Sequence, residues 1–203
     1  MRWRAYGEHA ALLDCDSPAQ TIAAHATISF ARPPGIAELV PGARSLLVVE
    51  IPGSGALAAA RDLLADADLA HPPEGEPREI TLDVTYDGED LELVARDAGV
   101  SIEDVVRLHT GAVYTVAFTG FAPGFGYLRG LPEPLRQPRL ATPRTRVPPG
   151  SVGIAGEFTG VYPRVSPGGW RLIGHTRTVL FDPRADPPAL LSPGDRVRFR
   201  SAG

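Results

Sequence analysis

Residues 118–132, 138–156 and 157–176 read FTGFAPGFGYLRGLP, PRLATPRTRVPPGSVGIAG and EFTGVYPRVSPGGWRLIGHT. These segments are rich in glycine and proline, and their apolar residues lack the spacing of a helix face, which is typical of short strands joined by tight turns. The expected product is an all-β barrel, because closing a sheet on itself removes its exposed edges. Within this half of the chain we predict strands at 113–118, 151–155, 178–181 and 196–200.

The preceding part of the chain has a different pattern, in which strands alternate with helices. Ser17 and Pro18 are typical of a helix start, and apolar residues then recur at helical spacing as far as Phe30. Two helices on one face of a small sheet give a two-layer α+β domain, which is ferredoxin-like if one further strand closes the sheet. The second helix is predicted over 56–67, and the strands at 12–15, 36–40 and 45–51.

A boundary between the two parts is predicted at residues 71–77, HPPEGEP, which have the composition of a linker. The strand that follows, 80–86, has apolar residues at alternate positions and could either close the first sheet or begin the barrel. Two helices come next, over 90–98 and 102–110, and Ser101 is the expected cap of the second. His109 lies on the apolar stripe of that helix, so we expect it to be packed and hydrogen-bonded rather than catalytic.

Composition excludes several classes of protein. The 20 lysine and arginine residues are all arginine, so the chain has neither the lysine of a Walker-type phosphate loop nor that of a Schiff-base enzyme. Cys15 is the single cysteine and the five histidines are scattered, so we expect no metal site. The first residues lack an apolar leader and no stretch is long enough to span a bilayer, which predicts a cytoplasmic protein without membrane contact.

Charge is distributed unevenly along the 203 residues, although the net charge is only −4. Residues 1–104 hold 19 acidic and 7 arginine side chains, whereas residues 105–181 hold 2 acidic and 9 arginine side chains. This asymmetry indicates either an anionic ligand or partner for the second half, or simply two solvated faces. We do not expect nucleic-acid binding, because the arginines lie in turn motifs rather than along a basic stripe.

The glycine-rich half also has the residue types of a ligand pocket, without indicating a reaction. Glycine allows close backbone approach, and arginine forks beside aromatic rings can bind an anion and stack on it. Ser151 lies in PGSVG rather than in the G-x-S-x-G turn of a serine hydrolase, and the glycines at 124–130 miss the dinucleotide spacing. Neither of those two classes of enzyme is therefore predicted.

The same three segments resemble the signature of the family that contains the B subunit of 5-oxoprolinase, allophanate hydrolase subunit 1 and the sporulation-kinase inhibitor KipI, whose shared region is carboxyltransferase domain, subdomains C and D. The matching patterns are GF-x-PGF-x-YL-x-GLP, PR-x-x-x-PR-x-x-VP-x-GSVGIAG and TG-x-YP-x-x-SPGGW-x-x-IG-x-T. The resemblance implies a small ferredoxin-like α/β domain over 1–77, followed by a cyclophilin-like β-barrel domain over 78–203. It places the strand at 80–86 in the barrel.

The resemblance implies a component of an ATP-dependent 5-oxoprolinase, which opens 5-oxoproline to L-glutamate. As a lactam-hydrolase component it would use ATP within an assembled hetero-oligomer, with other 5-oxoprolinase or allophanate hydrolase subunits, those of the C type (or type 2) and of the A type, as partners. It would be inactive alone. Two alternatives stay open: a component of allophanate hydrolase or urea carboxylase, and a KipI-like inhibitor of a sensor histidine kinase.

By the same resemblance a small anionic substrate would bind at the signature residues. Arg139 and Arg144 would hold its anionic group, near Arg146 on the same loop. No nucleophile or general base is evident, so the catalytic residues are unassigned. The remaining candidates offer hydroxyls, aromatic walls, backbone amides or an imidazole: Gly124, Phe125, Tyr127, Ser151, Tyr162, Ser166, Gly168, Trp170, His175 and Thr176.

The chain departs from the family pattern at two positions. Phe158 stands where the family usually has glutamine, which removes an amide that could bind substrate. His175 stands where the family has arginine or lysine, which replaces a permanent positive charge with one that titrates near neutrality. Both departures bear on the identity of the substrate.

The predicted helix cap gives a first test. Replacing Ser101→Ala removes the hydroxyl that accepts a hydrogen bond from a free amide of the first helical turn, so the free energy of unfolding should fall by about 1 kcal/mol. Urea unfolding followed by circular dichroism measures this loss, and an unchanged midpoint would contradict the assignment of the cap.

Overall fold

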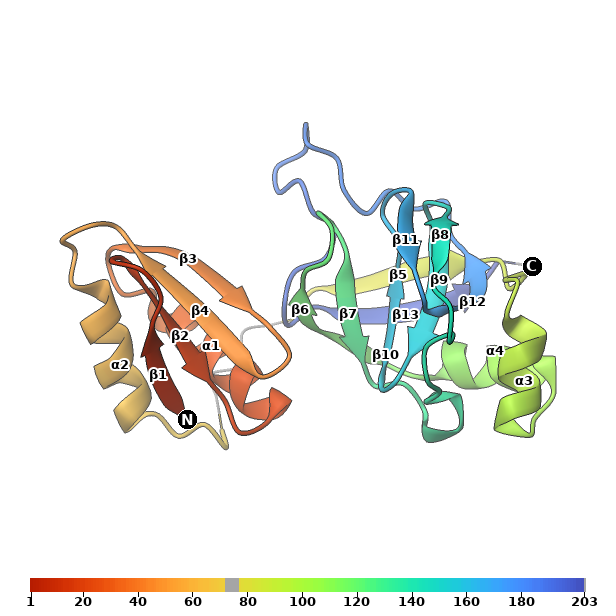
Figure 1. Ribbon diagram of the computed structural model, residues 1–203, viewed down its shortest axis with the longest axis horizontal. Helices are drawn as coiled ribbons and strands as arrows, with labels where there is room; N and C mark the ends of the chain where they lie inside the picture. Colours follow the sequence, from red (N-terminus) through yellow and green to blue (C-terminus); the bar gives the residue numbers. More distant parts are fainter. Residues whose placement is uncertain (72–76, 203) are drawn as a thin grey trace. The chain divides into compact units, whose positions relative to one another are not determined.

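The computed structural model describes residues 1–71 and 77–202 (Figure 1). Internal contacts divide the chain into two compact units, Met1–Pro77 and Arg78–Gly203, and each is described here by itself. Residues 72–76 of the predicted linker lie outside the described residues.

The first unit is a four-stranded antiparallel sheet with two helices on one face. Strand order is β1-β2-β4-β3, and residues of both helices join the alternate inward residues of β2 and β4 in one core. Ser17 begins the first helix as predicted, because its hydroxyl accepts a hydrogen bond from the Gln20 amide at 3.2 Å. The elements are β1 (Arg2–Ala5), β2 (Ala10–Asp14), α1 (Pro18–Ala31), β3 (Ile36–Pro41), β4 (Ser45–Glu50) and α2 (Ala56–Asp66).

The strand that completes this ferredoxin-like sheet comes from the start of the chain. Strand β1 pairs with β2 along Arg2–Ala5 and occupies the edge that a strand after α2 would otherwise fill. The sequence did not indicate β1, because three of its four residues are exposed and it has no apolar alternation. The strand predicted at 80–86 belongs to the second unit.

The second unit is a seven-stranded, nearly closed barrel of order β12-β9-β10-β7-β6-β13-β5 with a separate two-stranded sheet, β11-β8. Neighbouring strands are antiparallel except β13 and β5, which are parallel. The elements are β5 (Glu79–Val84), α3 (Leu91–Ala98), α4 (Ile102–Gly111), β6 (Tyr114–Thr119), β7 (Gly126–Arg129), the 3-10 turn Glu133–Leu135, β8 (Arg144–Val147), β9 (Ser151–Ala155), β10 (Phe158–Val161), β11 (Ser166–Gly168), β12 (Arg171–His175) and β13 (Arg196–Ser201).

One apolar core fills this barrel and extends beneath the two helices. Leu82, Val116, Leu128 and Phe199 are buried in it from four different strands, and Val94 of α3 packs on the same cluster. The alternation predicted for β5 is confirmed, since Leu82 and Val84 are buried while Thr81 and Asp83 are exposed. The Ser101 hydroxyl accepts a hydrogen bond from the Asp104 amide at 3.0 Å and caps α4 as predicted.

One predicted strand, 178–181, is wrong. Residues 178–180 belong to no strand, and Phe181 forms only an isolated bridge with Ala189. The local reason is the Thr176 hydroxyl, which accepts a hydrogen bond from the Thr178 amide at 3.2 Å and so replaces a bond between strands.

The edge strands of the barrel meet at a single backbone pair, Thr85 with His175. Each residue donates its amide to the other's carbonyl, at 2.9 and 2.8 Å. Gly174 makes this approach possible, because a Cβ there would collide with the Thr85 carbonyl oxygen. The barrel therefore has a seam that is closed at one point only.

His109 lies inside this core and is fully buried. Its Nδ1 lies 2.7 Å from the Tyr86 hydroxyl, and its Nε2 lies 3.0 Å from the Thr159 hydroxyl, which in turn donates to the Gly153 carbonyl. Because the Thr159 hydroxyl has given its proton to a carbonyl, it accepts from Nε2–H, and Nδ1 accepts from Tyr86. His109 is thus a neutral, fully hydrogen-bonded core residue, as expected.

Acid should destabilise the chain through His109. Burial lowers the pKa of His109 to about 3, whereas in the unfolded chain the residue takes up a proton near pH 6.5. This contribution to stability is complete above pH 6.5 and is lost as the pH falls toward 3, at up to about 1.4 kcal/mol per pH unit. Urea unfolding at several pH values should show a shallower acid dependence for His109→Gln, and parallel curves would contradict the buried neutral state.

Candidate functional site

A cluster of aromatic side chains covers the outer face of the barrel strands. Tyr127 lies beside Leu128, and Leu172, which packs with the aromatic rings, lies beside Ile173; in each pair the first side chain packs in this outer layer and the second in the barrel core. Side chains alternate between the two faces of a strand, so the cluster lies on the face opposite the core. We call this set the aromatic cluster: Phe125, Tyr127, Phe158, Tyr162 and Trp170.

Gly160 explains why the rings can pack directly on the sheet. A Cβ at Gly160 would lie 3.1 Å from the Trp170 ring and 3.2 Å from the Phe125 ring. Phe125 and Trp170 cross at 80° with their centroids 5.3 Å apart, which is a favourable edge-to-face contact. Phe125, Tyr162 and Trp170 are almost completely buried, so the aromatic cluster is a packed layer and its open part is at Tyr127, which is half-buried.

Two phenol groups of the aromatic cluster lie close enough to arginine side chains for the positive charge to affect their pKa values. Burial raises the pKa of Tyr127, and the nearby positive charge of Arg139 opposes this effect only in part. Burial likewise raises the pKa of Tyr162, against a hydrogen bond to the Trp170 backbone and the charges of Arg139 and Arg144. Both phenols stay protonated at neutral pH, so they can donate a hydrogen bond to a ligand but cannot serve as bases.

Arg144 is held in place by carboxylates of the segment that begins α3. Its Nη2 lies 2.9 Å from Asp90 Oδ1 and its Nε 3.2 Å from Glu89 Oε2. Asp90 is buried and uses its second oxygen to accept the Leu172 amide of β12 at 2.8 Å. Arg144 therefore joins the two-stranded β8–β11 sheet to the barrel, and only part of its guanidinium remains for a ligand.

Two buried polar atoms on the two-stranded β8–β11 sheet have no hydrogen-bond partner among the described residues. They are Nη1 of Arg144 and Oγ of Ser166. Buried polar atoms are normally satisfied, so these atoms are candidates for contact with a polar ligand. Together with Arg139, Tyr127 and Tyr162 they form what we call the arginine–tyrosine site.

Arg171 was not singled out from the sequence, although it positions the segment that carries Arg139. It is 8% exposed, and its Nη1 lies 2.7 Å from Asp97 Oδ2 and 2.5 Å from Gln137 Oε1. Its Nε donates to the carbonyl of Pro138, the residue before Arg139. A buried guanidinium with carboxylate, amide and carbonyl partners fixes this loop against α3 and β12.

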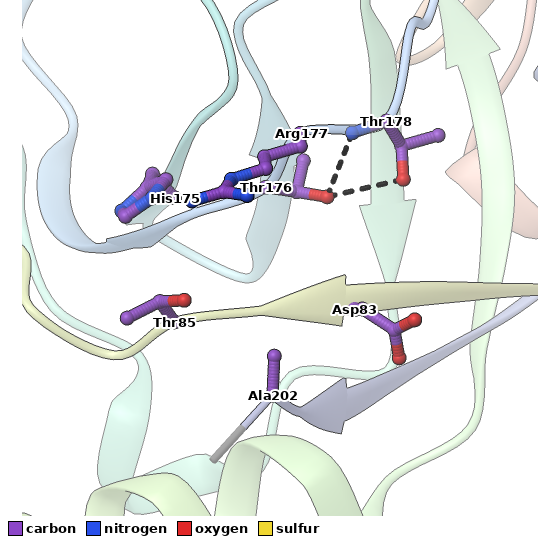
Figure 2. A pocket seen from close by; sticks show the side chains of 7 residues that line it. All are labelled: Asp83, Thr85, His175, Thr176, Arg177, Thr178 and Ala202. Carbon is purple, nitrogen blue, oxygen red and sulfur yellow. Dashed lines mark hydrogen bonds between the residues drawn. The ribbon is translucent and has the colours of Figure 1, made fainter.

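The structure separates the remaining predicted residues into two groups. Gly168 lies against the Tyr162 hydroxyl, where a side chain would collide with it, and Gly124 has a φ of +83° beside residues 180 and 181. Ser151 and His175 are paired at the ends of β9 and β12, and the Ser151 carbonyl accepts a hydrogen bond from the Tyr162 amide at 2.9 Å, whereas His175 and Thr176 are not members of the aromatic cluster. Figure 2 shows His175 and Thr176 on the wall of a hollow of about 520 Å³, near Thr85.

Residues 1–71 and 77–202 hold neither a cluster of metal ligands nor a membrane-spanning helix. Within these ranges no three His, Cys, Asp or Glu side chains gather so as to hold a metal ion. No helix in the same ranges has both the length and the apolar character that crossing a bilayer requires.

Comparison with known families agrees with this geometry. The family described as carboxyltransferase domain, subdomain C and D, matches residues 1–191. The chain belongs to this family. The match includes the first unit, most of the second and all the residues of the arginine–tyrosine site.

Two curated relatives both carry the name of the B subunit of 5-oxoprolinase. The protein of Escherichia coli O157:H7 is 45% identical over 209 residues, which cover 98% of this chain and 95% of that protein. The protein of Haemophilus influenzae is 51% identical over 125 residues, which cover 60% of this chain and 59% of that protein.

Solved structures confirm the architecture. TTHA0988 is 36% identical with a TM-score of 0.81, and the match covers 97% of this chain but 40% of that longer chain. The urea carboxylase of Kluyveromyces lactis has a TM-score of 0.65 at 20% identity, covering 99% of this chain and 22% of the enzyme, so it supports the fold alone. These neighbours confirm the mixed fold with a cyclophilin-like barrel.

The pairing of Arg144 with Asp90 predicts a cost in stability. Arg144→Ala leaves a buried carboxylate without its cation, so the free energy of unfolding should fall by about 1–3 kcal/mol. Arg146→Ala is the matched control, because Arg146 is exposed on the same strand and its loss should change the free energy by less than about 0.5 kcal/mol. Urea unfolding compares the two, and adding Asp90→Asn should recover part of the loss; equal stabilities of both arginine variants would contradict the pairing.

Proposed function

We propose that this chain is a component of an ATP-dependent 5-oxoprolinase, in which it helps to open the lactam 5-oxoproline to L-glutamate. The observation that carries the proposal is the 45% identity with the B subunit of E. coli 5-oxoprolinase, because it extends over nearly the full length of both chains. The likeness to K. lactis urea carboxylase is limited to the fold and favours no urea-derived substrate.

The chemistry explains the need for ATP. Resonance makes the carbonyl carbon of an amide a poor electrophile, and a lactam shares this property. Transfer of the terminal phosphoryl group of ATP to the carbonyl oxygen would end that resonance, release ADP and provide a leaving group for hydrolysis by water. The assembled complex binds the ATP, and this chain contributes substrate contacts.

The arginine–tyrosine site suits the binding of a small carboxylate. The Arg139 guanidinium is exposed and takes part in no ion pair among the described residues, so it can donate hydrogen bonds to the carboxylate of 5-oxoproline. The protonated phenol of Tyr127 can donate a hydrogen bond to the lactam oxygen, and the unpartnered Nη1 of Arg144 can stabilise negative charge on that atom. These groups bind and orient the substrate.

Partner subunits are part of the proposal, because the groups assigned here to bind the substrate are hydrogen-bond donors. The two phenols are held protonated and the arginines cannot take up a further proton, while the carboxylates of Glu89 and Asp90 are ion-paired with Arg144. We therefore assign the base that activates water to another polypeptide of the hetero-oligomer. The chain alone is accordingly expected to be inactive.

Reconstitution tests the proposal. The chain is purified and combined with its candidate partners of the A and C types, and glutamate and ADP release from 5-oxoproline and ATP are measured. The full set should release one glutamate with each ADP, and omission of this chain should abolish turnover. A set that hydrolyses urea-derived substrates but not 5-oxoproline would overturn the proposal.

A substitution at Arg139 tests the role of the site. Arg139→Gln should lower kcat/KM for 5-oxoproline at least about tenfold, the loss expected for one charge-assisted hydrogen bond, with an unchanged thermal midpoint. Arg107→Gln removes the same charge from the exposed face of α4 and should leave turnover unchanged. Equal activity of both variants would remove Arg139 from the site.

A further inference from the structure

The hollow beside His175 lies where the two edge strands of the barrel separate. Strand β5 and strand β12 pair at Thr85 and His175, and the next antiparallel partners, Asp83 and Arg177, would pair if both strands continued. Strand β12 ends at His175, and among the described residues no backbone hydrogen bond joins Asp83 to Arg177. Asp83 and Arg177 instead line opposite walls of the hollow, as Figure 2 shows, and we call this space the seam groove.

Backbone groups face the seam groove from β5. The carbonyls of Arg78 and Val84 accept hydrogen bonds from amides of the neighbouring strand β13 and of the residue that follows it. Along a strand, the backbone groups of successive residues point alternately to the two sides. The amide and carbonyl of Asp83 therefore point, like those of Thr85, toward β12. A ligand in the groove meets a free amide at the place where a strand would otherwise pair.

The wall opposite β5, formed by residues 175–178, is held rigid by its own hydrogen bonds. The Thr176 amide donates to the Gly150 carbonyl at 2.9 Å, and the Thr176 hydroxyl lies 3.1 Å from the Thr178 hydroxyl. His175 is oriented by Asp87, whose Oδ1 lies 2.8 Å from Nδ1 of the imidazole. The groove is thus lined by ordered hydroxyls and an oriented imidazole.

Arg177 supplies the seam groove with a positive charge that has no ion-pair partner among the described residues, while the exposed carboxylate of Asp87 is hydrogen-bonded to His175. Asp83 is neutralised by Arg200 of β13, whose Nε and Nη2 lie 2.6 and 2.9 Å from its two oxygens. Arg177 is exposed and forms no ion pair with any described residue, and Figure 2 shows its side chain extending along the wall toward His175. One guanidinium with threonine hydroxyls around it has the chemistry of a site for an anionic oxygen group.

We propose that the seam groove is a binding site for a small molecule with a carboxylate or phosphate group. Arg177 binds the anionic oxygens, the Thr85 and Thr178 hydroxyls and the Asp83 amide donate to them, and the volume of about 520 Å³ admits a compact metabolite. The site is separate from the arginine–tyrosine site and does not depend on the proposed function. Its test is therefore binding by the isolated full chain, without turnover.

Two substitutions should change the affinity in opposite directions. Arg177→Gln removes the unpaired cation and should weaken anion binding about tenfold. Asp83→Asn removes negative charge from the wall and releases Arg200 from its ion pair, so it should strengthen binding about threefold. Arg184→Gln is the control, because this exposed arginine does not line the groove and its loss should leave the affinity unchanged.

The measurement is a titration of the ¹⁵N-labelled chain followed by NMR, with separate arms for inorganic phosphate, acetate and 5-oxoproline. Binding should shift the amides of Thr85 and of residues 175–178, and the arm with the lowest Kd identifies phosphate or carboxylate as the preferred group. Absence of these shifts in all three arms would overturn the proposal. The proposal is also overturned if Arg177→Gln and Arg184→Gln weaken binding equally, or if Asp83→Asn weakens binding as much as Arg177→Gln does.

Discussion

The single backbone pair between Thr85 and His175 is the constraint on which the second unit depends. It brings the first and last strands of a seven-stranded sheet together, so that one apolar core is enclosed and its edges are protected. The pair requires Gly174, because any side chain there would meet the Thr85 carbonyl. Because the seam is closed at one residue pair and not along two strands, the same contact also creates the groove beyond it.

Carboxylates of α3 decide which arginines remain available for a ligand. The buried Asp90 and the exposed Asp97, at the two ends of α3, hold Arg144 and Arg171, and these two guanidinium groups attach the loops of the family signature to the barrel. Each pair has one buried member, Asp90 in the first and Arg171 in the second, and removing its partner leaves that buried charge uncompensated. Arg139 and Arg177 have no such partner among the described residues and are exposed, so they can meet an external anion at little cost in stability.

Alternation between buried and exposed residues accounts for only part of what the sequence predicted. Strands β5 and β13 alternate and were found, whereas β12 is buried on both faces and β11 has three residues, so neither shows a period of two. Strand β9 was found although all its residues are buried, and β7 was missed although its burial alternates. Residues Arg139, Arg144, Tyr127 and Tyr162 could be singled out from their motifs. The separation of His175 and Thr176 into another hollow could not, because it depends on where β12 stops pairing.

The two departures from the family pattern act at these two different places. Phe158 belongs to the aromatic cluster, where its ring lies 5.7 Å from Phe118 and 5.8 Å from Tyr127, so at this position the chain adds packing where an amide would add a polar contact. His175 lies in the seam groove and is bound to Asp87, so a permanent charge there is replaced by an imidazole whose orientation is fixed by a carboxylate. The first change leaves the exposed Arg139 and the half-buried Tyr127 as the accessible polar groups of the arginine–tyrosine site. The second leaves Arg177 as the groove's permanent unpaired cation among the described residues, and the anion affinity of the groove then depends on that one side chain.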